Sequence, residues 1–324
     1  MRSMQSFPRT PAPTSLHTEK EHTMRVVFEQ ILLLLVFIGL GYILSKTGKA
    51  NGNYSKLLSQ LGFYIFLPSN VFRTFANNFN TEYLSANYPL IIVSAVYVVA
   101  MMFIGIPISK LLSKDAYQQA IYRYSLISSN YGYVGYALAG SIFGDQVLLN
   151  VMMFTIPLSV YTYSIGYCML TKNKLSFKKL LSPVNIALVA GAIVGITGFR
   201  LPGIVSTFLS KSIGCMGPIS MLLTGMVIAQ YDIKALLGNK SVYILAVLRL
   251  LVIPIGVCGL MVLLGLRELL LPVLVILSLP CGLNTIVFPK LIGEDCKTGA
   301  ALACVTSVLC CATIPLCLRI FGVY

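Results

Sequence analysis

Charged residues are scarce in this sequence, at 10% of 324 positions, and acidic residues are the scarcest of them, with ten in all. Hydrophobic residues fill 57% of the positions, and the mean hydropathy is +0.84. Ordinary soluble domains hold about 25% charged residues. The composition therefore excludes a water-soluble globular fold.

The sequence also lacks the patterns of metal and redox sites. Its two histidines, His17 and His22, lie in the polar N-terminal stretch, and its nine cysteines form no C-x-x-C pair. Most of these cysteines lie inside apolar segments, where cysteine behaves as a small buried hydrophobic residue. We expect no metal site, no cofactor and no histidine chemistry in the apolar part of the chain.

Long apolar runs are what the sequence does contain. A membrane-crossing helix needs roughly 20 apolar residues, and runs such as 31–44 lack the alternation of a β-barrel strand. The runs predict an all-α integral membrane protein with about ten transmembrane helices. Bounded by Gly, Pro, Asn and charge, the expected spans are 26–46, 54–76, 84–111, 117–143, 146–170, 183–199, 205–231, 241–265, 268–292 and 298–321.

An internal repeat divides these ten spans into two halves of five. Because five is odd, the second half must enter the membrane from the opposite face, an inverted repeat typical of secondary transporters. We therefore predict a disordered polar N-terminal tail (1–25), a first five-helix repeat (26–170), a short basic cytoplasmic connection (171–182) and a second five-helix repeat (183–324). Matching residues lie 150 positions apart: Gly41, Ile43, Thr47, Gly48 and Pro68 recur as Gly191, Ile193, Thr197, Gly198 and Pro218.

The net charge of +14 lies in short connections between apolar runs, which indicates membrane orientation and not nucleic-acid binding. Since cytoplasmic connections are the positive ones, the distribution predicts a multi-pass protein of the cell membrane with both termini outside. The connections then inside hold Lys46, Lys49, Lys56, Lys110, Lys114, Arg123, Lys172, Lys174, Lys178, Lys179, Lys234, Lys240, Lys290 and Lys297. Apart from the N-terminal tail, the outside then holds Arg73, Arg200, Lys211, Arg267 and Arg319.

The fourth and the ninth expected helices are interrupted. Residues 128–136 read SSNYGYVGY and residues 278–285 read SLPCGLNT, in which Gly tolerates unwound backbone and Pro removes a donor. Broken helices in lipid are costly unless they line a cavity, so we expect the two to cross and to aim positive half-helix N-termini at an anion. The predicted substrate-binding residues are Asn130, Tyr131, Gly132, Tyr133, Gly135, Pro280, Cys281, Gly282, Asn284 and Thr285.

Two asparagines carry this hypothesis. The amides of Asn130 and Asn284 can donate to a carboxylate without the cost of burying a full positive charge. The alternative interpretation is that both interruptions are plain kinks with interhelical hydrogen bonds and no ligand. Tyr131, Tyr133 and Tyr136 could form a wall around an organic acid, although packing is the more common role of such residues.

No acidic residue falls at the middle of an expected helix, which disfavours an ion exchanger that depends on a buried carboxylate. Arg249, in the eighth helix, is the one well-embedded charge. Either it attracts substrate, or its long side chain reaches the membrane interface, and the sequence favours the second role.

Several segments resemble the auxin efflux carrier family, which includes bacterial malate or malonate permeases and plant auxin exporters. The similarity covers residues 26 to 322, apart from Ala137, where the family usually has a proline. The matching stretches are Asn130-Tyr131-Gly132-Tyr133-Val134-Gly135, Gly144, Ser182-Pro183-Val184-Asn185-Ile186-Ala187, Gly217-Pro218, Pro280-Cys281-Gly282-Leu283-Asn284 and Thr313-Ile314-Pro315.

The resemblance implies ten helices, a substrate site where helices 4 and 9 cross, and an elevator-like motion of a transport domain against a scaffold of helices 1, 2, 6 and 7. It also implies a homodimer that associates through this scaffold. The expected partners are thus a small organic acid, the lipid bilayer and a second copy of the chain.

Two other functions are open. A sodium-coupled bile-acid-type symporter of organic anions would need acidic side chains near the crossing, which this sequence lacks. A membrane-embedded receptor or enzyme would need a constellation such as His/Asp pairs within the helices, and there is none. We expect a transporter and not an enzyme.

Overall fold

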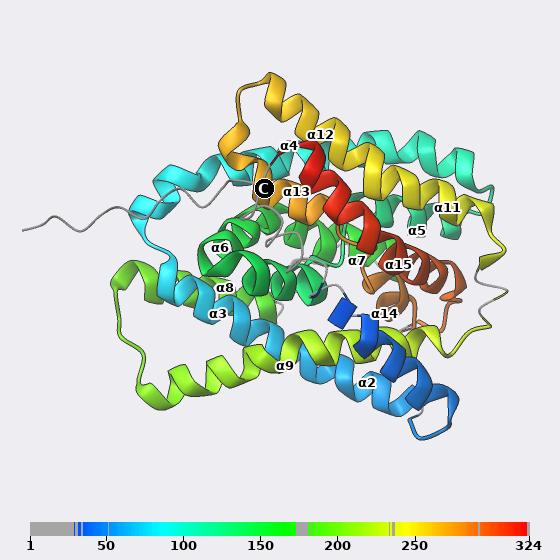
Figure 1. The fold of residues 1–324 in the computed structure, drawn as a ribbon, viewed down its shortest axis with the longest axis horizontal. Helices are drawn as coiled ribbons and strands as arrows, with labels where there is room; N and C mark the ends of the chain where they lie inside the picture. Colours follow the sequence, from blue (N-terminus) through cyan, green and yellow to red (C-terminus); the bar gives the residue numbers. More distant parts are fainter. Residues whose placement is uncertain are drawn as a thin grey trace, which may run out of the picture.

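The computed structural model describes residues 29, 32–33, 35–50, 52–172, 181, 183–232, 234, 237–290 and 292–322, and over these residues the regular structure is helical (Figure 1). The predicted tail, 1–25, and most of the predicted connection, 171–182, lie outside the described residues. The first half contains helix Leu35–Lys46, α2 (Gly52–Leu61), η1 (Gly62–Phe66), α3 (Leu67–Asn78), α4 (Thr81–Leu112), α5 (Ala116–Ile127), η2 (Tyr131–Gly135), α6 (Tyr136–Tyr161), η3 (Thr162–Gly166) and α7 (Tyr167–Thr171).

The part of the chain after residue 182 is helical as well. Its elements are α8 (Pro183–Thr197), α9 (Gly203–Ile228), α11 (Lys240–Val247), η5 (Leu248–Val252), α12 (Ile253–Leu263), η6 (Arg267–Leu269), α13 (Leu270–Leu277), α14 (Asn284–Lys290) and α15 (Lys297–Ile320).

One glycine separates two of the expected spans. Helix α6 runs through both the fourth and the fifth, but at Gly144 its backbone turns to φ 80°, ψ 178°. Only glycine adopts such a conformation readily, so Gly144 ends one crossing and allows the next to begin. The spans predicted to end at 143 and to begin at 146 therefore agree with the structure.

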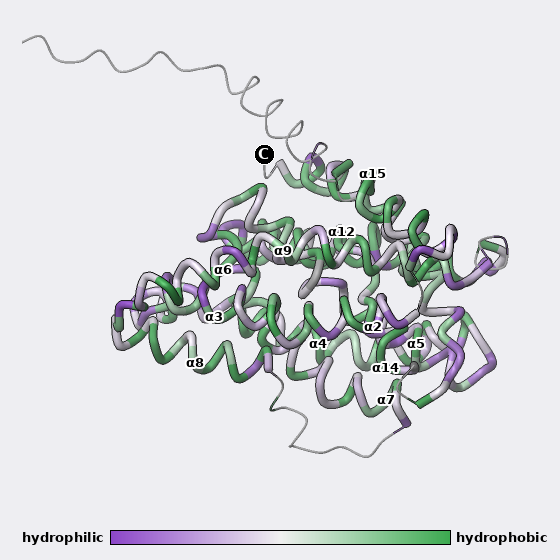
Figure 2. Tube along the Cα trace, turned by 90° about the horizontal axis from the view of Figure 1, so that it is seen from below, coloured by the Kyte–Doolittle hydropathy of each residue, from purple (hydrophilic) through white to green (hydrophobic). Residues whose placement is uncertain are grey.

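Several helices are long and apolar enough to cross a bilayer. Among the described residues these are Thr81–Leu112, Tyr136–Thr171, Gly203–Ile228, Lys240–Leu263 and Lys297–Ile320, with the shorter apolar helices Leu35–Lys46 and Pro183–Thr197. Figure 2 shows hydrophobic residues over the middle of most helices and hydrophilic residues gathered toward their ends. On α4, Val96 and Phe103 are 63% and 70% exposed, as side chains that face lipid would be. The chain is a multi-pass membrane protein.

Glycines allow two helix pairs to approach closely. Helix Leu35–Lys46 crosses α9 where a Cβ on Gly41 would lie 2.2 Å from the Leu222 carbonyl oxygen. Helices α3 and α8 run side by side, and a Cβ on Gly191 would lie 2.6 Å from the Phe72 carbonyl oxygen (Figure 1). Small residues at such contacts let helix backbones pack directly in a membrane. Gly41 and Gly191 are one of the residue pairs 150 positions apart.

Candidate functional site

The two interruptions lie against each other. After α5 ends at Ile127, residues 128–130 leave the helix, and after α13 ends at Leu277, residues 278–283 do the same. The Asn130 N–H donates to the Pro280 carbonyl oxygen at 2.9 Å, and Ser129 pairs with Cys281 in an isolated antiparallel bridge. We call residues 128–130 and 278–283 the paired segments. Their mutual hydrogen bonding satisfies backbone groups that would be costly to leave free in hydrocarbon.

The glycines of the first interruption act differently from the prediction. Gly132 and Gly135 lie within the π-helical turn η2, so the break itself falls earlier, at residues 128–130. A Cβ on Gly135 would lie 2.5 Å from Leu279 Cδ1, and one on Gly282 would lie 3.2 Å from the Ser129 carbonyl oxygen. Both glycines therefore provide room for the opposite interruption, Gly135 from within a helical turn and Gly282 from within the second paired segment.

The two predicted asparagine ligands have different surroundings. Asn130 is 4% exposed, and its side-chain amide makes no hydrogen bond within the described part of the chain. Asn284, at the start of α14, donates from Nδ2 to the hydroxyl oxygen of Tyr124 at 3.0 Å. The Asn130 amide thus has no hydrogen-bond partner among the described residues, whereas the Asn284 amide forms an interhelical hydrogen bond.

Most of the other predicted site residues are buried; Tyr131, Gly135, Pro280, Cys281, Gly282 and Thr285 are so, while Gly132 is partly exposed. Tyr131 and Tyr136 bond through their hydroxyls to Ser159 (3.1 Å) and Thr155 (2.5 Å), which indicates packing of the fourth helix on the fifth. Thr285 donates to the Gly282 carbonyl oxygen at 2.9 Å. The side chain of Tyr133 lies outside the described part of the structure.

A threonine from α15 holds the second paired segment. The Cys281 N–H donates to Thr306 Oγ1 at 3.0 Å, and Thr306, fully buried, in turn donates to the Leu302 carbonyl oxygen. A Thr306→Val substitution keeps the shape but leaves the Cys281 N–H unsatisfied, so we expect it to lower the stability of the protein by about 1–3 kcal/mol. The measurement is thermal unfolding of the purified protein in detergent.

Thr313→Val is the matched control on the same helix. The Thr313 hydroxyl is buried without a hydrogen-bond partner, so its removal should leave stability unchanged or slightly raised. Equal losses for the two variants would contradict the role given to Thr306.

The position of the Arg249 side chain differs from the prediction. Its side chain is fully buried, so it does not reach the membrane interface as the sequence favoured. Nη1 donates to the Leu277 carbonyl oxygen at 2.7 Å and Nη2 to that of Ile276 at 3.5 Å. Arg249 therefore binds the last carbonyls of α13, directly before the second paired segment.

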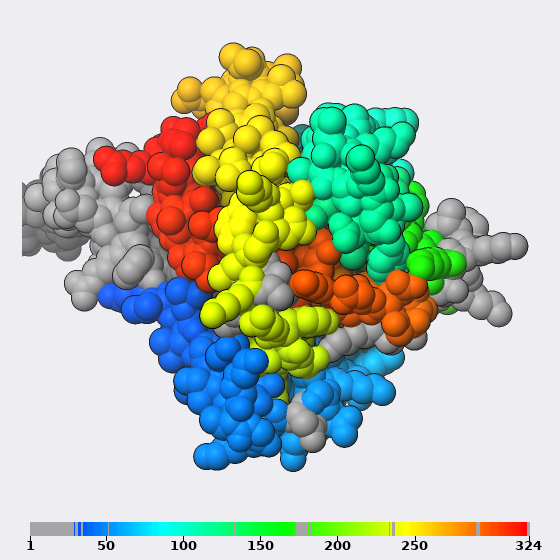
Figure 3. Space-filling view, turned by 90° about the vertical axis from the view of Figure 1, so that its right-hand side faces the viewer, coloured from blue at the N-terminus to red at the C-terminus, as the bar shows by residue number. Residues whose placement is uncertain are grey.

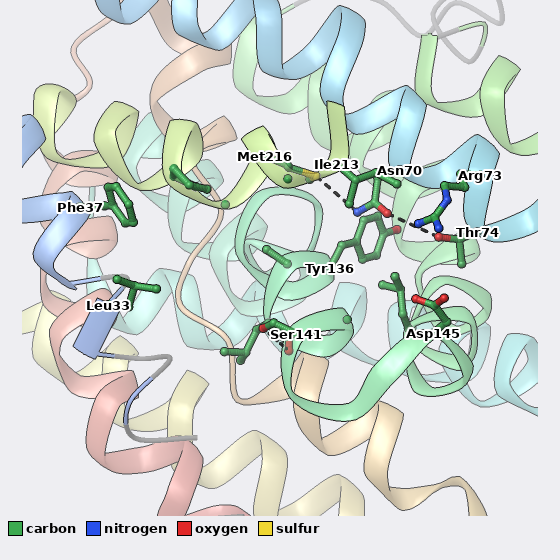
Figure 4. A pocket seen from close by; sticks show the side chains of 17 residues that line it. Leu33, Phe37, Asn70, Arg73, Thr74, Tyr136, Ser141, Asp145, Ile213 and Met216 are labelled. Atoms are coloured by element: carbon green, nitrogen blue, oxygen red, sulfur yellow. Dashed lines mark hydrogen bonds between the residues drawn. The ribbon is translucent and has the colours of Figure 1, made fainter. Parts of the chain in front are cut away.

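A cavity of about 330 Å³ lies between helix Leu35–Lys46, α3, α6 and α9, and it reaches Tyr136, the residue directly after η2. None of the ten predicted site residues lines it, although Tyr136, considered above as a wall residue, does. Figure 4 shows Arg73 and Asp145 on the same side of this cavity, near Thr74. The Arg73 Nε is buried without a hydrogen-bond partner.

The sequence pattern did not indicate this cavity, because Arg73 is predicted to lie in an outer connection. A signal was present in the second helix, where Asn70, Arg73 and Thr74 follow the i, i+3, i+4 spacing of one helix face. Asn70 Nδ2 contacts Met216 Sδ of α9 at 3.5 Å, and Thr74 donates to Asn70 Oδ1 at 3.5 Å. The polar face thus points across to α9, as Figure 4 shows.

Interrupted apolar helices that pair inside the membrane, next to a cavity with charged residues, are typical of membrane transporters. The sequence model of a family described as "Membrane transport protein" matches residues 26–179 and 170–318, and the chain belongs to this family, the auxin efflux carrier family. The chain is also similar to an uncharacterized transporter, MJ1031, of Methanocaldococcus jannaschii. The two are 24% identical over 307 residues, which cover 90% of this chain and 97% of that protein.

Proposed function

We propose that this transporter carries small organic anions and that it binds their carboxylate at the paired segments. The observation that carries the proposal is the buried Asn130 amide, which has no partner within the described residues. The two N–H donors of this amide suit a carboxylate oxygen. A carboxylate at this position would bind a donor that the described part of the chain leaves unused.

We infer further that the chain is built from two inverted repeats whose interrupted helices, the fourth and the ninth, cross. The half-helices α5 and α13 end at Ile127 and Leu277, 150 positions apart. The same turn closes both ends, since Ser128 N–H donates to Tyr124 O at 2.8 Å and Ser278 N–H to Leu274 O at 2.9 Å. Both pairs keep the 150-residue spacing of the sequence repeat.

Contacts between connections that are distant in the sequence support the proposed topology of ten crossings. The Ser241 hydroxyl donates to the Leu112 carbonyl oxygen at 2.7 Å, and Lys172 forms an ion pair with Glu294. In a ten-helix topology all four residues lie in connections, or at the helix ends next to them, on one face, which is the cytoplasmic face if both termini are outside. Figure 3 views this part of the molecule, where α11 (yellow) lies against the turquoise segment that includes the end of α4.

The burial of the site supports a transport cycle. Asn130, Cys281 and Thr285 are 4%, 1% and 0% exposed, so the paired segments are closed to solvent in this conformation. The cavity reaches Tyr136 and Ala137 on the fourth helix from the side of Arg73 and Asp145. Alternating access then requires the interrupted helices to move relative to the glycine-packed pairs, helix 1 with α9 and α3 with α8.

The homodimer belongs to the same proposal. Helix α8 presents Ile186, Val189 and Ile193 at 54%, 57% and 57% exposure. This apolar face lies on the helices of the proposed scaffold, where a second copy in the cell membrane would pack.

The test is uptake of labelled organic acids by proteoliposomes that contain the purified chain. The panel comprises dicarboxylates, aromatic acetates and short aliphatic acids, with a matched neutral amide for each. We expect uptake of at least one class of acid above that of protein-free liposomes and no uptake of its amide. Uptake of none of the acids, in either orientation of the gradient, would refute the proposed function.

A further inference from the structure

The ends of the two interrupted half-helices are capped by side chains from the preceding crossing. In the first half, the Tyr97 hydroxyl of α4 donates to the carbonyl oxygens of Leu126 (3.0 Å) and Ile127 (3.3 Å) at the end of α5. In the second half, Arg249 of η5 binds the carbonyl oxygens of Ile276 and Leu277 at the end of α13. The two capped pairs of carbonyls lie 150 positions apart.

The two capping side chains bind the same kind of carbonyl group but differ in charge. Each donates to the last carbonyls of a half-helix, where the regular i to i+4 hydrogen bonds of the helix have ended. Tyr97 does so as a neutral hydroxyl and Arg249 as a permanent cation. A neutral residue therefore suffices for this capping, and the positive charge of Arg249 calls for another explanation.

The charge of Arg249 is only partly compensated. The residue is 0% exposed, its Nε is buried without a partner, and no carboxylate lies within ion-pair distance of it in the described part of the chain. The carboxyl end of α13 supplies a partial negative charge equivalent to at most about half a unit. A buried cation without a counter-ion is strongly unfavourable, so the region around the end of α13 is left electropositive.

We infer that Arg249 is the specificity-determining residue that makes the paired segments select an anion over a neutral molecule of the same shape. This inference rests on the proposed function and assigns its charge selectivity to one residue. Asn130 supplies neutral donors from the fourth helix. Arg249 supplies the positive charge at the end of α13, the first part of the ninth helix. Pro280 lies three residues beyond Leu277, within about 11 Å along the chain. At about 10 Å and an effective dielectric constant near 20, one unit charge changes anion affinity roughly tenfold.

The experiment compares acids with their neutral amides in binding to the purified full chain in lipid nanodiscs. The probes are phenylacetate with phenylacetamide and malonate with malonamide. Arg249→Gln keeps amide donors for the α13 carbonyls and removes the charge, while Arg249→Lys keeps the charge. Tyr97→Phe is the matched control, because it removes the cap of α5 without any change in charge.

We expect Arg249→Gln to reduce the ratio of acid to amide affinity about tenfold or more, and Arg249→Lys to preserve most of that ratio. Tyr97→Phe should lower thermal stability and leave the ratio unchanged. A ratio that Arg249→Gln leaves at the wild-type value, or that Tyr97→Phe lowers equally, overturns the inference while the proposed function stands. Failure of the wild type to bind either acid counts against the proposed function itself and removes the inference with it.

Discussion

Asn130→Ala is expected to reduce transport by tenfold or more while the protein inserts and folds as the wild type does. The amide has no hydrogen-bond partner among the described residues, so its removal breaks no internal hydrogen bond there. A bound carboxylate would lose a donor in a site that excludes water, where each hydrogen bond to a charged group contributes about 1.5–3 kcal/mol. Uptake into proteoliposomes and thermal unfolding in detergent measure the two effects separately.

Asn284→Ala should behave differently in one respect. Its amide binds Tyr124 at 3.0 Å, so the variant should lose stability as well as most uptake. Asn87→Ala is the control for a generic asparagine, because Asn87 donates only to the Tyr83 carbonyl of its own helix. Wild-type uptake by both Asn130→Ala and Asn284→Ala would exclude the paired segments as the substrate site.

Gly41→Leu is expected to prevent most of the protein molecules from folding. A Cβ on Gly41 would lie 2.2 Å from the backbone oxygen of Leu222, and backbone cannot move aside as a flexible side chain can. Overpacking of this kind costs about 1–3 kcal/mol for small additions and more for a whole leucine side chain at a backbone contact. The measurements are the yield of monodisperse protein by size-exclusion chromatography and its unfolding temperature.

Gly39→Leu is the matched control on the same helix. Nothing lies within 4 Å of a Cβ built on Gly39, so this variant should fold in normal yield and should raise helix propensity. Gly41→Ala should fall between the two. If Gly39→Leu and Gly41→Leu gave the same yield, the close crossing of the first helix with α9 would not be the contact that stabilises this part of the fold.

Most of the helix positions followed from hydropathy and from the Gly, Pro, Asn and charged residues that bound the apolar runs. The third helix was predicted over 84–111 and lies at Thr81–Leu112, and the tenth was predicted over 298–321 and lies at Lys297–Ile320. Such segments are predictable because each must be apolar over its whole length to be stable in lipid. The turn at Gly144 was predictable too, since glycine is the residue that tolerates its backbone angles.

The site was less accessible to sequence reasoning. The interruptions at 128–136 and 278–285 were visible, but the exact break at residues 128–130 was not, because it depends on hydrogen bonds to Pro280 and Cys281 about 150 residues away. The burial of Arg249 was predicted wrongly. A long basic side chain in an apolar run can reach the interface or bind carbonyls, and only the position of α13 decides between these.

The sequence by itself determined that the chain is a helical membrane protein, where most of its helices lie and which of them are interrupted, because hydropathy, glycine and proline act locally along the chain. Only the tertiary structure decided that the Asn130 amide has no hydrogen-bond partner among the described residues while that of Asn284 is bound, that Arg249 caps α13 and that Arg73 borders a cavity. These properties depend on which groups from distant segments come within hydrogen-bond distance, and no local pattern specifies that distance.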